Sequence, residues 1–452
     1  MPLLIANIGN RDLLLDGNEC VPARTEGERL LERFDEISGR LGFPIFGRAL
    51  EYVEKTRGEK PDRLSIILFA TDQPDREYRE SDTIAFGRII KKRFGKNRRI
   101  SLCVIQEEPN YYDSMFVFYR TKLRELAPKG KDADAVYVLA TAGAPACNMA
   151  LLFHSIALFG DSVVPLYVKK DAPVIEMQIA AQLMESFARR AVVNHINSYD
   201  YAAAIGVERM HGNVRSLAEA AQARLNFDFR AAYNGLRVVR GTISGATAGL
   251  VSIENHMAKI IEENDDAALL RELALNIDIK YRARQYADLL GRLFRFEEAL
   301  LQWAVRVFGD ITIDEKQKGK EGFSQFLASV RKQDGLEKYL KTVKTGSGPI
   351  DYTKPTRPVL RKIIDFLSER KTDMPGQLKQ VLECADAIMK FSDLRNKSVI
   401  AHGFKGISGD ELKKFEIDRV LELIRSIAGD TSGISFDRMN ECIIGLLGSE
   451  RV

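Results

Sequence analysis

Residues 135–151, AVYVLATAGAPACNMAL, contain the signal that decides the fold of the first part of the chain. A continuous apolar run, AVYVLA, leads directly into the small residues TAGAPA, which open a segment of helical character. Such a loop exposes backbone N–H groups at a helix N-terminus, which suits a phosphate or another ligand that must approach the backbone closely. For this loop alone the simpler interpretation stays open, that small residues only let helix and strand pack.

Four similar apolar runs surround this one in the first ~170 residues, and all five are short enough for buried strands. The other four are LLIANI (3–8), LSIILFA (64–70), ISLCVI (100–105) and SVVPLYV (162–168). Helix-like segments lie between the runs, around 27–56, 80–95, 113–127 and 145–159. Continuous apolar strands that alternate with helices are typical of a parallel sheet covered on both faces. We therefore expect a Rossmann-like, doubly wound α/β domain over residues 1–173.

Polar loops follow the predicted strands and would gather at one edge of the sheet. They are NIGNRD (7–12), ATDQPD (70–75), QEEP (106–109) and the small-residue loop that starts at Thr141. In doubly wound sheets ligands bind beyond the carboxyl ends of the strands, so this edge is the predicted binding site. A nicotinamide dinucleotide site and a P-loop are disfavoured, because neither G-x-G-x-x-G nor G-x-x-x-x-G-K is present in these loops.

Residues 174–452 have helical periodicity almost throughout, with breaks at 344–358 and 372–376. We expect an all-helical second domain, so the predicted fold class is α/β plus all-α. The chain is 45% hydrophobic and 29% charged with a net charge of +4, too small to indicate a nucleic-acid binder by itself. Its five cysteines form no C-x-x-C pair, and no apolar run is long enough for a signal peptide or a membrane span. A cytoplasmic location is the expectation.

The segment SDLRNKSVIAHG (392–403) suggests chemistry in the second domain. On a helix, Arg395 and His402 would project from nearly the same face, with Asn396 beside them and Gly403 ending the helix. Arg–His pairs at this spacing also arise by chance on surface helices. Several basic residues nearby favour a polyanionic partner: Lys390, Lys397, Lys405, Lys413, Lys414, Arg357, Arg361 and Lys362. No H-E-x-x-H motif supports a metal site, and the other histidines, His154, His195, His211 and His256, are poor ligand candidates.

The first loop IGNRD, the loop TAGAPACNMAL and the late motif RNKSVIAH, in this domain order, resemble the CARF–HEPN ribonucleases of type III CRISPR systems. The resemblance covers the whole chain in architecture and implies an N-terminal domain that binds cyclic oligoadenylate across a homodimer interface. It would place the following residues in that pocket: Asn10, Arg11, Thr71, Thr141, Gly143, Ala144 and Asn148. The family often has a threonine where this chain has Ala144, so degradation of the activator by the pocket stays open, as does its ring size, tetra- or hexa-adenylate.

For the second domain the resemblance implies a metal-independent endoribonuclease without a cofactor, which cleaves single-stranded RNA in a composite dimer site. The 2′-OH of the RNA would attack, Arg395 would stabilise the phosphorane, His402 would move protons, and Asn396 would orient them. Lys397 and Lys405 would bind RNA. The products would be a 2′,3′-cyclic phosphate and a 5′-hydroxyl.

Two other functions remain open. The main alternative is a non-enzymatic, nucleotide-sensing regulator whose helical domain binds a partner or DNA, although no basic helix-turn-helix is evident. A nucleotide-dependent oxidoreductase or transferase ranks lowest, because the glycine fingerprint is missing.

Overall fold

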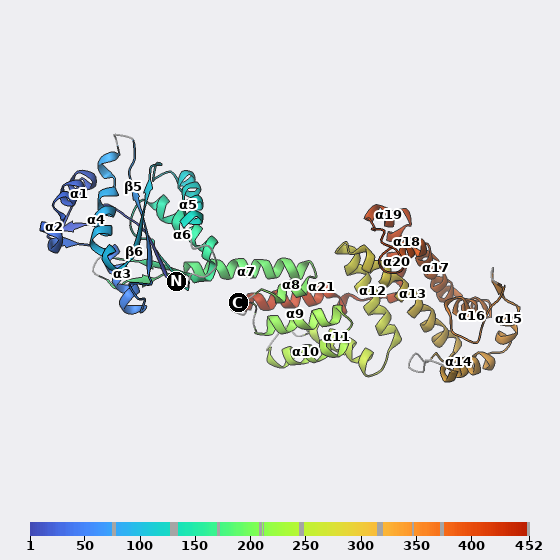
Figure 1. Cartoon of the computed structure of the whole chain (residues 1–452). Helices are drawn as coiled ribbons and strands as arrows, with labels where there is room; N and C mark the ends of the chain where they lie inside the picture. The colour runs from blue at the N-terminus through green and yellow to red at the C-terminus, as the bar shows by residue number, and fades with distance from the viewer. Residues whose placement is uncertain are drawn as a thin grey trace. The chain divides into compact units, whose positions relative to one another are not determined.

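The computed structural model describes most of the chain, namely residues 1–74, 78–126, 134–169, 172–207, 210, 212–243, 248–313, 320–345, 348–370 and 375–449. Two compact units make up the chain, Met1–Phe187 and Ala188–Val452 (Figure 1). The division falls inside the helix α7 (Ile179–Asn197), whereas the sequence predicts a boundary at residue 173. Among the described residues, no helix combines the length and apolar character that crossing a bilayer requires.

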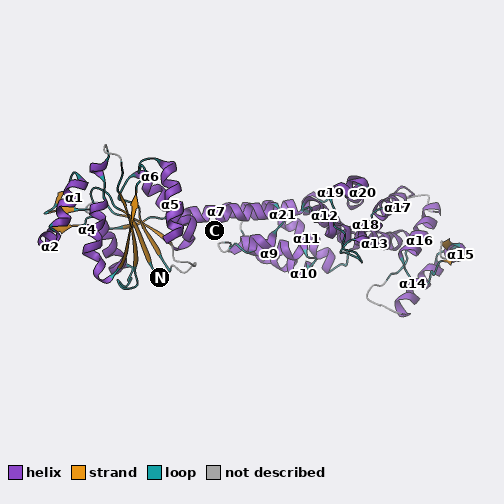
Figure 2. Cartoon of the chain, turned by 45° about the horizontal axis from the view of Figure 1, so that its top comes forward, coloured by secondary structure: helices purple, strands orange, loops and turns teal. Residues whose placement is uncertain are grey.

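The first unit is built on a sheet of six strands in the order β6-β5-β1-β7-β8-β9 (Figure 2). All pairs are parallel except β8 with the edge strand β9. The strands are β1 (Leu3–Asn7), β5 (Ser65–Thr71), β6 (Arg99–Ile105), β7 (Val136–Leu139), β8 (Val163–Tyr167) and β9 (Ile175–Glu176). The five predicted strands are confirmed. The chain adds strands on one side of β1 and then on the other, so a topological switch point lies at β1.

Helices cover both faces of this sheet (Figure 2). On one face α1 (Ala23–Glu32) and α4 (Ile84–Phe94) share a core with Leu4, Ala6 and Leu68. On the other face α5 (Tyr112–Leu126) and α6 (Pro145–Phe159) pack against side chains from the opposite positions of the same strands. Alternate residues of each strand point to opposite faces, so strands buried on both sides must be apolar throughout. The predicted doubly wound α/β unit is confirmed.

The predicted helix over 27–56 is wrong in its middle. Beyond α1, only α2 (Phe34–Ile37) and α3 (Phe46–Glu51) are α-helical, and a π-helix follows at Tyr52–Thr56. A small antiparallel sheet lies between them and the first loop, with β2 (Leu14–Leu15), β3 (Asn18–Glu19) and β4 (Leu41–Gly42). Two glycines and a proline over 39–44 interrupt helical periodicity, which favours the turn that brings β4 to β2. Short strands also follow Pro173, namely β9 and the pair β10 (Lys344–Thr345) and β11 (Gly348–Pro349).

The second unit is helical, as predicted, and has two apolar cores. One core joins α7 to α8 (Tyr201–Ile205), α9 (Gly212–Leu225), α10 (Phe229–Thr242), α11 (Ala248–Ile261) and the last helix α21 (Phe436–Ser449). The larger core joins α12 (Asp266–Arg282), α13 (Tyr286–Gly309), α14 (Lys320–Lys332), α15 (Leu336–Thr342), α16 (Arg357–Arg370), α17 (Pro375–Met389), α18 (Ser392–Lys397), α19 (Gly409–Lys414) and α20 (Ile417–Ala428). The last helix therefore returns to the beginning of the unit.

A buried ion pair ties these helices together. Arg224 of α9, 1% exposed, donates from Nε to both oxygens of Glu272 of α12, at 3.2 and 3.0 Å. It also donates from Nη2 to the Ile434 carbonyl, 2.6 Å away, and lies 4.2 Å from the Phe436 ring centre. Burial raises the pKa of Glu272, but Arg224 and His256 outweigh this, so the pKa lies below its ordinary value. Glu272 therefore stays ionised and fixes Arg224, which in turn holds Ile434 in the segment before α21.

Replacing Glu272 with alanine leaves the Arg224 guanidinium buried without its carboxylate. We expect the free energy of unfolding to fall by about 3–5 kcal/mol, measured by denaturant unfolding of the full chain followed through the helical unit. The matched control is Glu219→Ala, which breaks the exposed pair with Arg215 and should cost about 0.5 kcal/mol or less. Equal, small losses in the two variants would contradict the assignment of a stabilising role to the buried pair.

Candidate functional site

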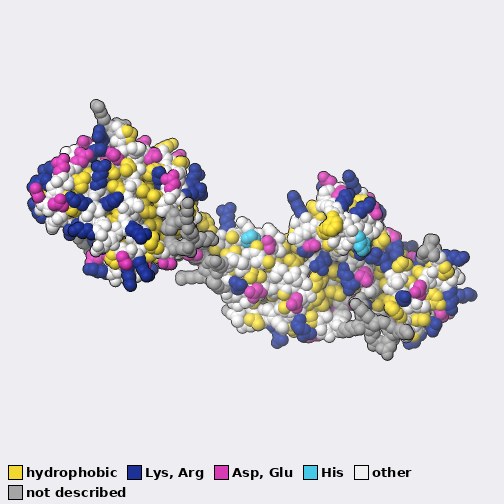
Figure 3. All heavy atoms as spheres, in the orientation of Figure 1, with side chains coloured by type: hydrophobic (Ala, Val, Ile, Leu, Met, Phe, Trp, Pro, Cys, Tyr) yellow, Lys and Arg dark blue, Asp and Glu magenta, His cyan; other side chains and the backbone are white. Residues whose placement is uncertain are grey.

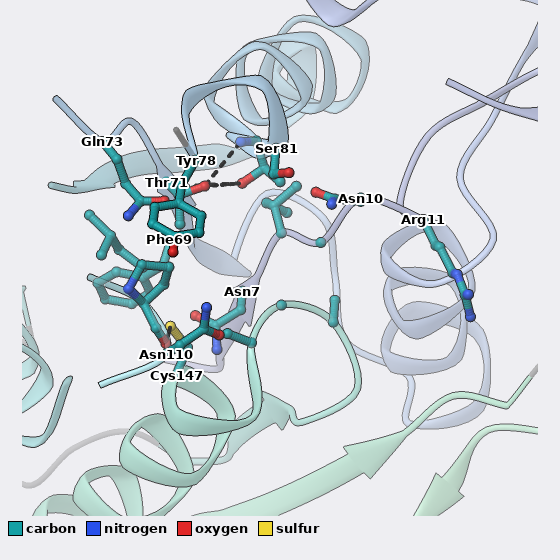
Figure 4. Close-up of a pocket in the computed structure, with 18 of the residues that line it drawn as sticks. Asn7, Asn10, Arg11, Phe69, Thr71, Gln73, Tyr78, Ser81, Asn110 and Cys147 are labelled. Atoms are coloured by element: carbon teal, nitrogen blue, oxygen red, sulfur yellow. Dashed lines mark hydrogen bonds between the residues drawn. The ribbon is translucent and has the colours of Figure 1, made fainter. Parts of the chain in front are cut away.

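A cavity of about 490 Å³ lies at the carboxyl ends of β1, β5 and β7, next to the switch point (Figure 4). Six of the seven residues predicted for the pocket line it: Asn10, Arg11, Thr71, Thr141, Gly143 and Ala144. The remaining lining residues include polar groups that the sequence analysis did not select: Asn7, Gln73, Tyr78, Ser81, Thr83 and Asn110. The predicted edge of the sheet is therefore hollow, and polar and apolar groups line it in similar measure.

Two glycines let the first and fourth loops touch behind the cavity. A β-carbon on Gly9 would lie only 2.6 Å from the backbone nitrogen of Gly143. Gly143 itself has a φ of +86°, in the left-handed region that favours glycine. The loops therefore meet backbone to backbone, and the amides that open α6 remain near the ligand space. Ala144 caps α6 without a side-chain hydrogen bond and Pro145 follows it, which leaves the first-turn amides to a ligand.

Asn7 is the polar centre of the pocket floor and is 2% exposed. Its Nδ2 donates to Asn148 Oδ1 at 2.8 Å, and the Tyr119 hydroxyl donates to its Oδ1. Asn148 does not line the cavity, so the prediction that it does is wrong. Asn148 lies one helical turn after the start of α6, and its hydrogen bond to Asn7 fixes the orientation of the Asn7 side chain. Only the fold, which pairs β1 with β7, brings residues 7 and 148 together.

The threonines of the pocket are tied to backbone. Thr71 and Thr83 each accept, through Oγ1, the backbone N–H of the other at 3.1 Å. Thr141 Oγ1 accepts from the Val168 N–H at 2.8 Å. These hydroxyls shape the loop ends. Asn10 and Arg11 are exposed instead, and Figure 4 shows Arg11 apart from the cluster around Asn7.

Asp12 stabilises the loop after β1 through hydrogen bonds to backbone N–H groups. It is fully buried, and its two oxygens accept the N–H groups of Gly9 at 2.7 Å and Phe46 at 3.1 Å. Burial raises its pKa to about 7, although both backbone hydrogen bonds favour the ionised form. Because the pKa is higher in the folded protein, this group contributes stability that is present below about pH 4 and lost as the pH rises through about 7.

We predict that Asp12→Asn, which cannot titrate, changes how the stability of the first unit depends on pH. From pH 5 to pH 8 the melting temperature of the variant should rise relative to that of the wild type, because only the wild type loses the proton. The measurement is thermal unfolding at both pH values, with the exposed Asp35→Asn as control, which should follow the wild type. A wild-type curve parallel to the Asp12→Asn curve would contradict the buried titration.

In the second unit α13 supports the whole of the predicted catalytic segment. The Arg395 guanidinium lies 4.8 Å from the ring centre of Phe294. A β-carbon on Gly291, one turn earlier, would meet Ile400 Cγ2 at 3.5 Å, and one on Gly409 would meet the Tyr286 hydroxyl at 2.9 Å. The chain from Arg395 to Gly409 therefore runs along α13 toward its N-terminus.

The prediction of one helix from Arg395 to His402 is wrong. Helix α18 ends at Lys397, and Ser398 is extended, with φ −93° and ψ 170°. The buried Ser398 hydroxyl donates to the Arg395 carbonyl at 2.8 Å and accepts the Ile400 N–H at 3.3 Å. These local bonds replace the helical ones, a known tendency of serine. His402 is exposed in the turn that follows, so helical spacing does not fix its relation to Arg395, and Gly403 does not end a helix.

The two lysines of this segment have carboxylate partners, whereas Arg395 differs in this respect. Lys397 and Lys405 are exposed and pair with Asp393 at 2.8 Å and Glu411 at 2.6 Å. Figure 3 likewise shows Lys and Arg side chains mixed with Asp and Glu on the face in view. In the described part of the chain, no carboxylate lies within ion-pairing distance of Arg395. Its N–H donors therefore remain available, and Asn396 beside it is exposed.

Within the described residues, no three His, Cys, Asp or Glu side chains are grouped closely enough to hold a metal ion. His154 packs between Phe116 and Phe153, and burial lowers its pKa, in keeping with a core role. His256 lies 3.0 Å from Glu272, in the buried pair described above. His211 lies outside the described residues.

Residues 259–444 match the family model of the Cas_Csm6 HEPN domain, a range that contains α13 and the Arg395–His402 segment. This part of the chain is similar to the HEPN domain of Csm6 proteins. The fold of the whole chain is similar to that of Enterococcus italicus Csm6 bound to cyclic hexa-2′-fluoro-hexa-dAMP, with a TM-score of 0.58 at 16% identity. That match covers 99% of this chain and 100% of the other. No curated protein sequence matches. The resemblance to CARF–HEPN proteins is confirmed, with a CARF-like α/β unit before the HEPN domain.

Proposed function

We propose that this protein is a CRISPR-associated endoribonuclease of type III systems, which a cyclic oligoadenylate activates and which acts in the cytoplasm. The observation that carries the proposal is Arg395, an arginine without a carboxylate partner, held over Phe294 inside a Csm6 HEPN domain. An RNA phosphate is the partner that this guanidinium lacks. The family match supports ribonuclease activity, and the cavity in the first unit supports the sensing role.

The proposed activator binds in the cavity of the first unit. Its lining suits adenylate units, since backbone amides at the start of α6 fit phosphates and the exposed amides of Asn10 and Asn110 fit adenine edges. The similar Enterococcus italicus structure holds a ring of six nucleotide units, so cyclic hexa-adenylate is the first ring to test, before cyclic tetra-adenylate. We do not include degradation of the ring, because Ala144 has no hydroxyl and the Thr71 and Thr141 oxygens already accept backbone N–H groups.

RNA cleavage would need no metal, because the RNA supplies its own nucleophile. The 2′-OH attacks the adjacent phosphorus, Arg395 donates to the added negative charge, and His402 accepts or returns a proton. Asn396 orients the pair, and Lys397 and Lys405 release Asp393 and Glu411 when they contact the RNA backbone. The expected products are a 2′,3′-cyclic phosphate and a 5′-hydroxyl.

We propose that the working unit is a homodimer, with the ring across the interface of the sensing units and two Arg395–His402 pairs in one cleft. Exposed apolar side chains surround His402: Val399, Ile400 and Phe404, the last of them 95% exposed. A second copy of the segment would cover them, since exposed apolar patches commonly mark interaction surfaces. Activation then requires only that the ring bind the cleavage-competent dimer more tightly than the resting one.

His402→Ala should lower the turnover rate for single-stranded RNA by about 10²–10⁴-fold, the usual contribution of a positioned proton-transfer group. Ring binding should be unchanged. The assay is cleavage of a fluorescent RNA in EDTA with saturating ring. His195→Ala, a histidine of α7 outside the site, is the matched control and should keep wild-type rates. A fully active His402→Ala enzyme would exclude this residue from the chemistry.

Arg11→Ala should raise the ring concentration for half-maximal activation about tenfold, equivalent to the loss of about 1.4 kcal/mol of binding. The maximal rate at saturating ring should not change. The control is Arg33→Ala, which is also exposed in the first unit and pairs with Glu36 as Arg11 pairs with Glu19, but does not line the cavity. If both variants respond to the ring like the wild type, Arg11 is not part of the sensing site.

The non-enzymatic regulator remains the alternative. It predicts that the chain binds the ring but cleaves no RNA with either ring size.

A further inference from the structure

A second cavity, of about 300 Å³, lies beside Arg395 between α13, α16 and α18. Its size is at the lower end of the range for small-molecule sites. Its lining combines two arginines and one carboxylate with neutral polar and apolar side chains: Arg357, Arg395, Glu298, Gln302, Thr356, Leu301, Pro355 and Leu360. Arg295 compensates the negative charge of Glu298, because Arg295 Nη1 donates to the Glu298 carboxylate at 2.9 Å.

The two arginines of this cavity share one aromatic support. Phe294, 4% exposed, has the Arg395 guanidinium carbon 4.8 Å and the Arg357 guanidinium carbon 5.5 Å from its ring centre. Two like charges approach one ring although they repel each other. Glu297 compensates the charge of Arg357, so among the described residues Arg395 is the guanidinium of the two that lacks an anion, a place that a phosphate fits.

A buried carboxylate fixes the second arginine. Glu297, 0% exposed, lies 2.7 Å from Arg357 Nη2, and Arg357 Nη1 lies 3.4 Å from Met389 Sδ. Arg357 is the first residue of α16, and its side chain, held by this pair, lines the cavity. Its partial exposure leaves the other edge of the guanidinium for a ligand.

We propose that this cavity is a nucleotide subsite of the RNA-cleaving centre, in which Arg357 binds the phosphate next to the one that Arg395 contacts. Gln302 and Thr356 hydrogen-bond the edge of the intervening base, and Glu297 is the positioning residue of Arg357. The inference rests on the proposed ribonuclease function and extends it, because it names residues outside the Arg395–His402 segment that hold the substrate.

The test compares Arg357→Ala with Arg361→Ala. Arg361 lies one turn further along α16, pairs with Asp386, and does not line the cavity. In the ring-activated full-length enzyme, Arg357→Ala should raise KM for single-stranded RNA about tenfold, and Arg361→Ala less than about twofold. Because Arg357→Ala also leaves Glu297 buried alone, Arg357→Lys is the second variant: it keeps the charge and the fold but loses the two-pronged contact, so KM should still rise.

A direct binding measurement separates substrate contact from catalysis. In the His402→Ala background, the Kd of a single-stranded oligonucleotide with 2′-deoxy sugars should rise with Arg357→Lys as KM does, with an unchanged melting temperature. Gln302→Leu should alter the relative cleavage rates of poly(A), poly(C) and poly(U), since it removes base-edge hydrogen bonds while filling the same space.

Equal KM values for Arg357→Lys and Arg361→Ala, with a wild-type base preference in Gln302→Leu, would overturn the subsite and leave the ribonuclease function intact. If the wild-type enzyme cleaves no RNA with either ring, both the subsite and the proposed ribonuclease function are contradicted.

Discussion

The packing of Phe294 under two guanidinium groups is the interaction on which the candidate cleavage site depends. Its ring belongs to the buried face of α13, a helix of 24 residues that crosses the larger apolar core. Because that face is fixed by close packing, Arg395 and Arg357 are held before substrate arrives, and little side-chain entropy is lost on binding. The turn that carries His402 has no such anchor. The proposed site would thus combine a rigid half that binds phosphate with an exposed half that transfers protons, and a second copy of the chain would complete it.

The sensing pocket follows a different principle. In our proposal the backbone there is the main binding surface. Small residues are needed because the loops after β1 and β7 come into contact at Gly9 and Gly143. Polar side chains with fixed partners, above all Asn7 and Asp12, hold these loops in place. Such a pocket is formed in advance, so the ring would change the protein by preferring one arrangement of the dimer rather than by building its own site. Ring binding and RNA cleavage would then be linked only through the relative stability of the resting dimer and the cleavage-competent dimer.

The sequence was sufficient for features that depend on long apolar runs or on neighbours in the chain. The strands of the main sheet, the change to helices and the loops at the carboxyl edge were predictable because a strand buried on both faces must be continuously apolar. Strands of two residues, such as β2 and β4, leave no periodic signal. The helix break at Ser398 depends on whether its side chain or the helical backbone forms the local hydrogen bonds, and the spacing of Arg395 and His402 does not reveal this. Asn148 behind Asn7, and Glu297 beside Arg357, follow from contacts between distant parts of the chain, which a single sequence does not encode in any local pattern.

The central claim is that a ring bound in the first unit controls metal-independent RNA cleavage in the second. The most direct measurement is the cleavage rate of one fluorescent single-stranded RNA by the wild-type chain in EDTA, without ring, with cyclic hexa-adenylate and with cyclic tetra-adenylate. The account predicts rapid cleavage with one of the two rings, little without, and products that end in a 2′,3′-cyclic phosphate. Cleavage at the same rate without any ring, or only after a divalent metal is added, would contradict it.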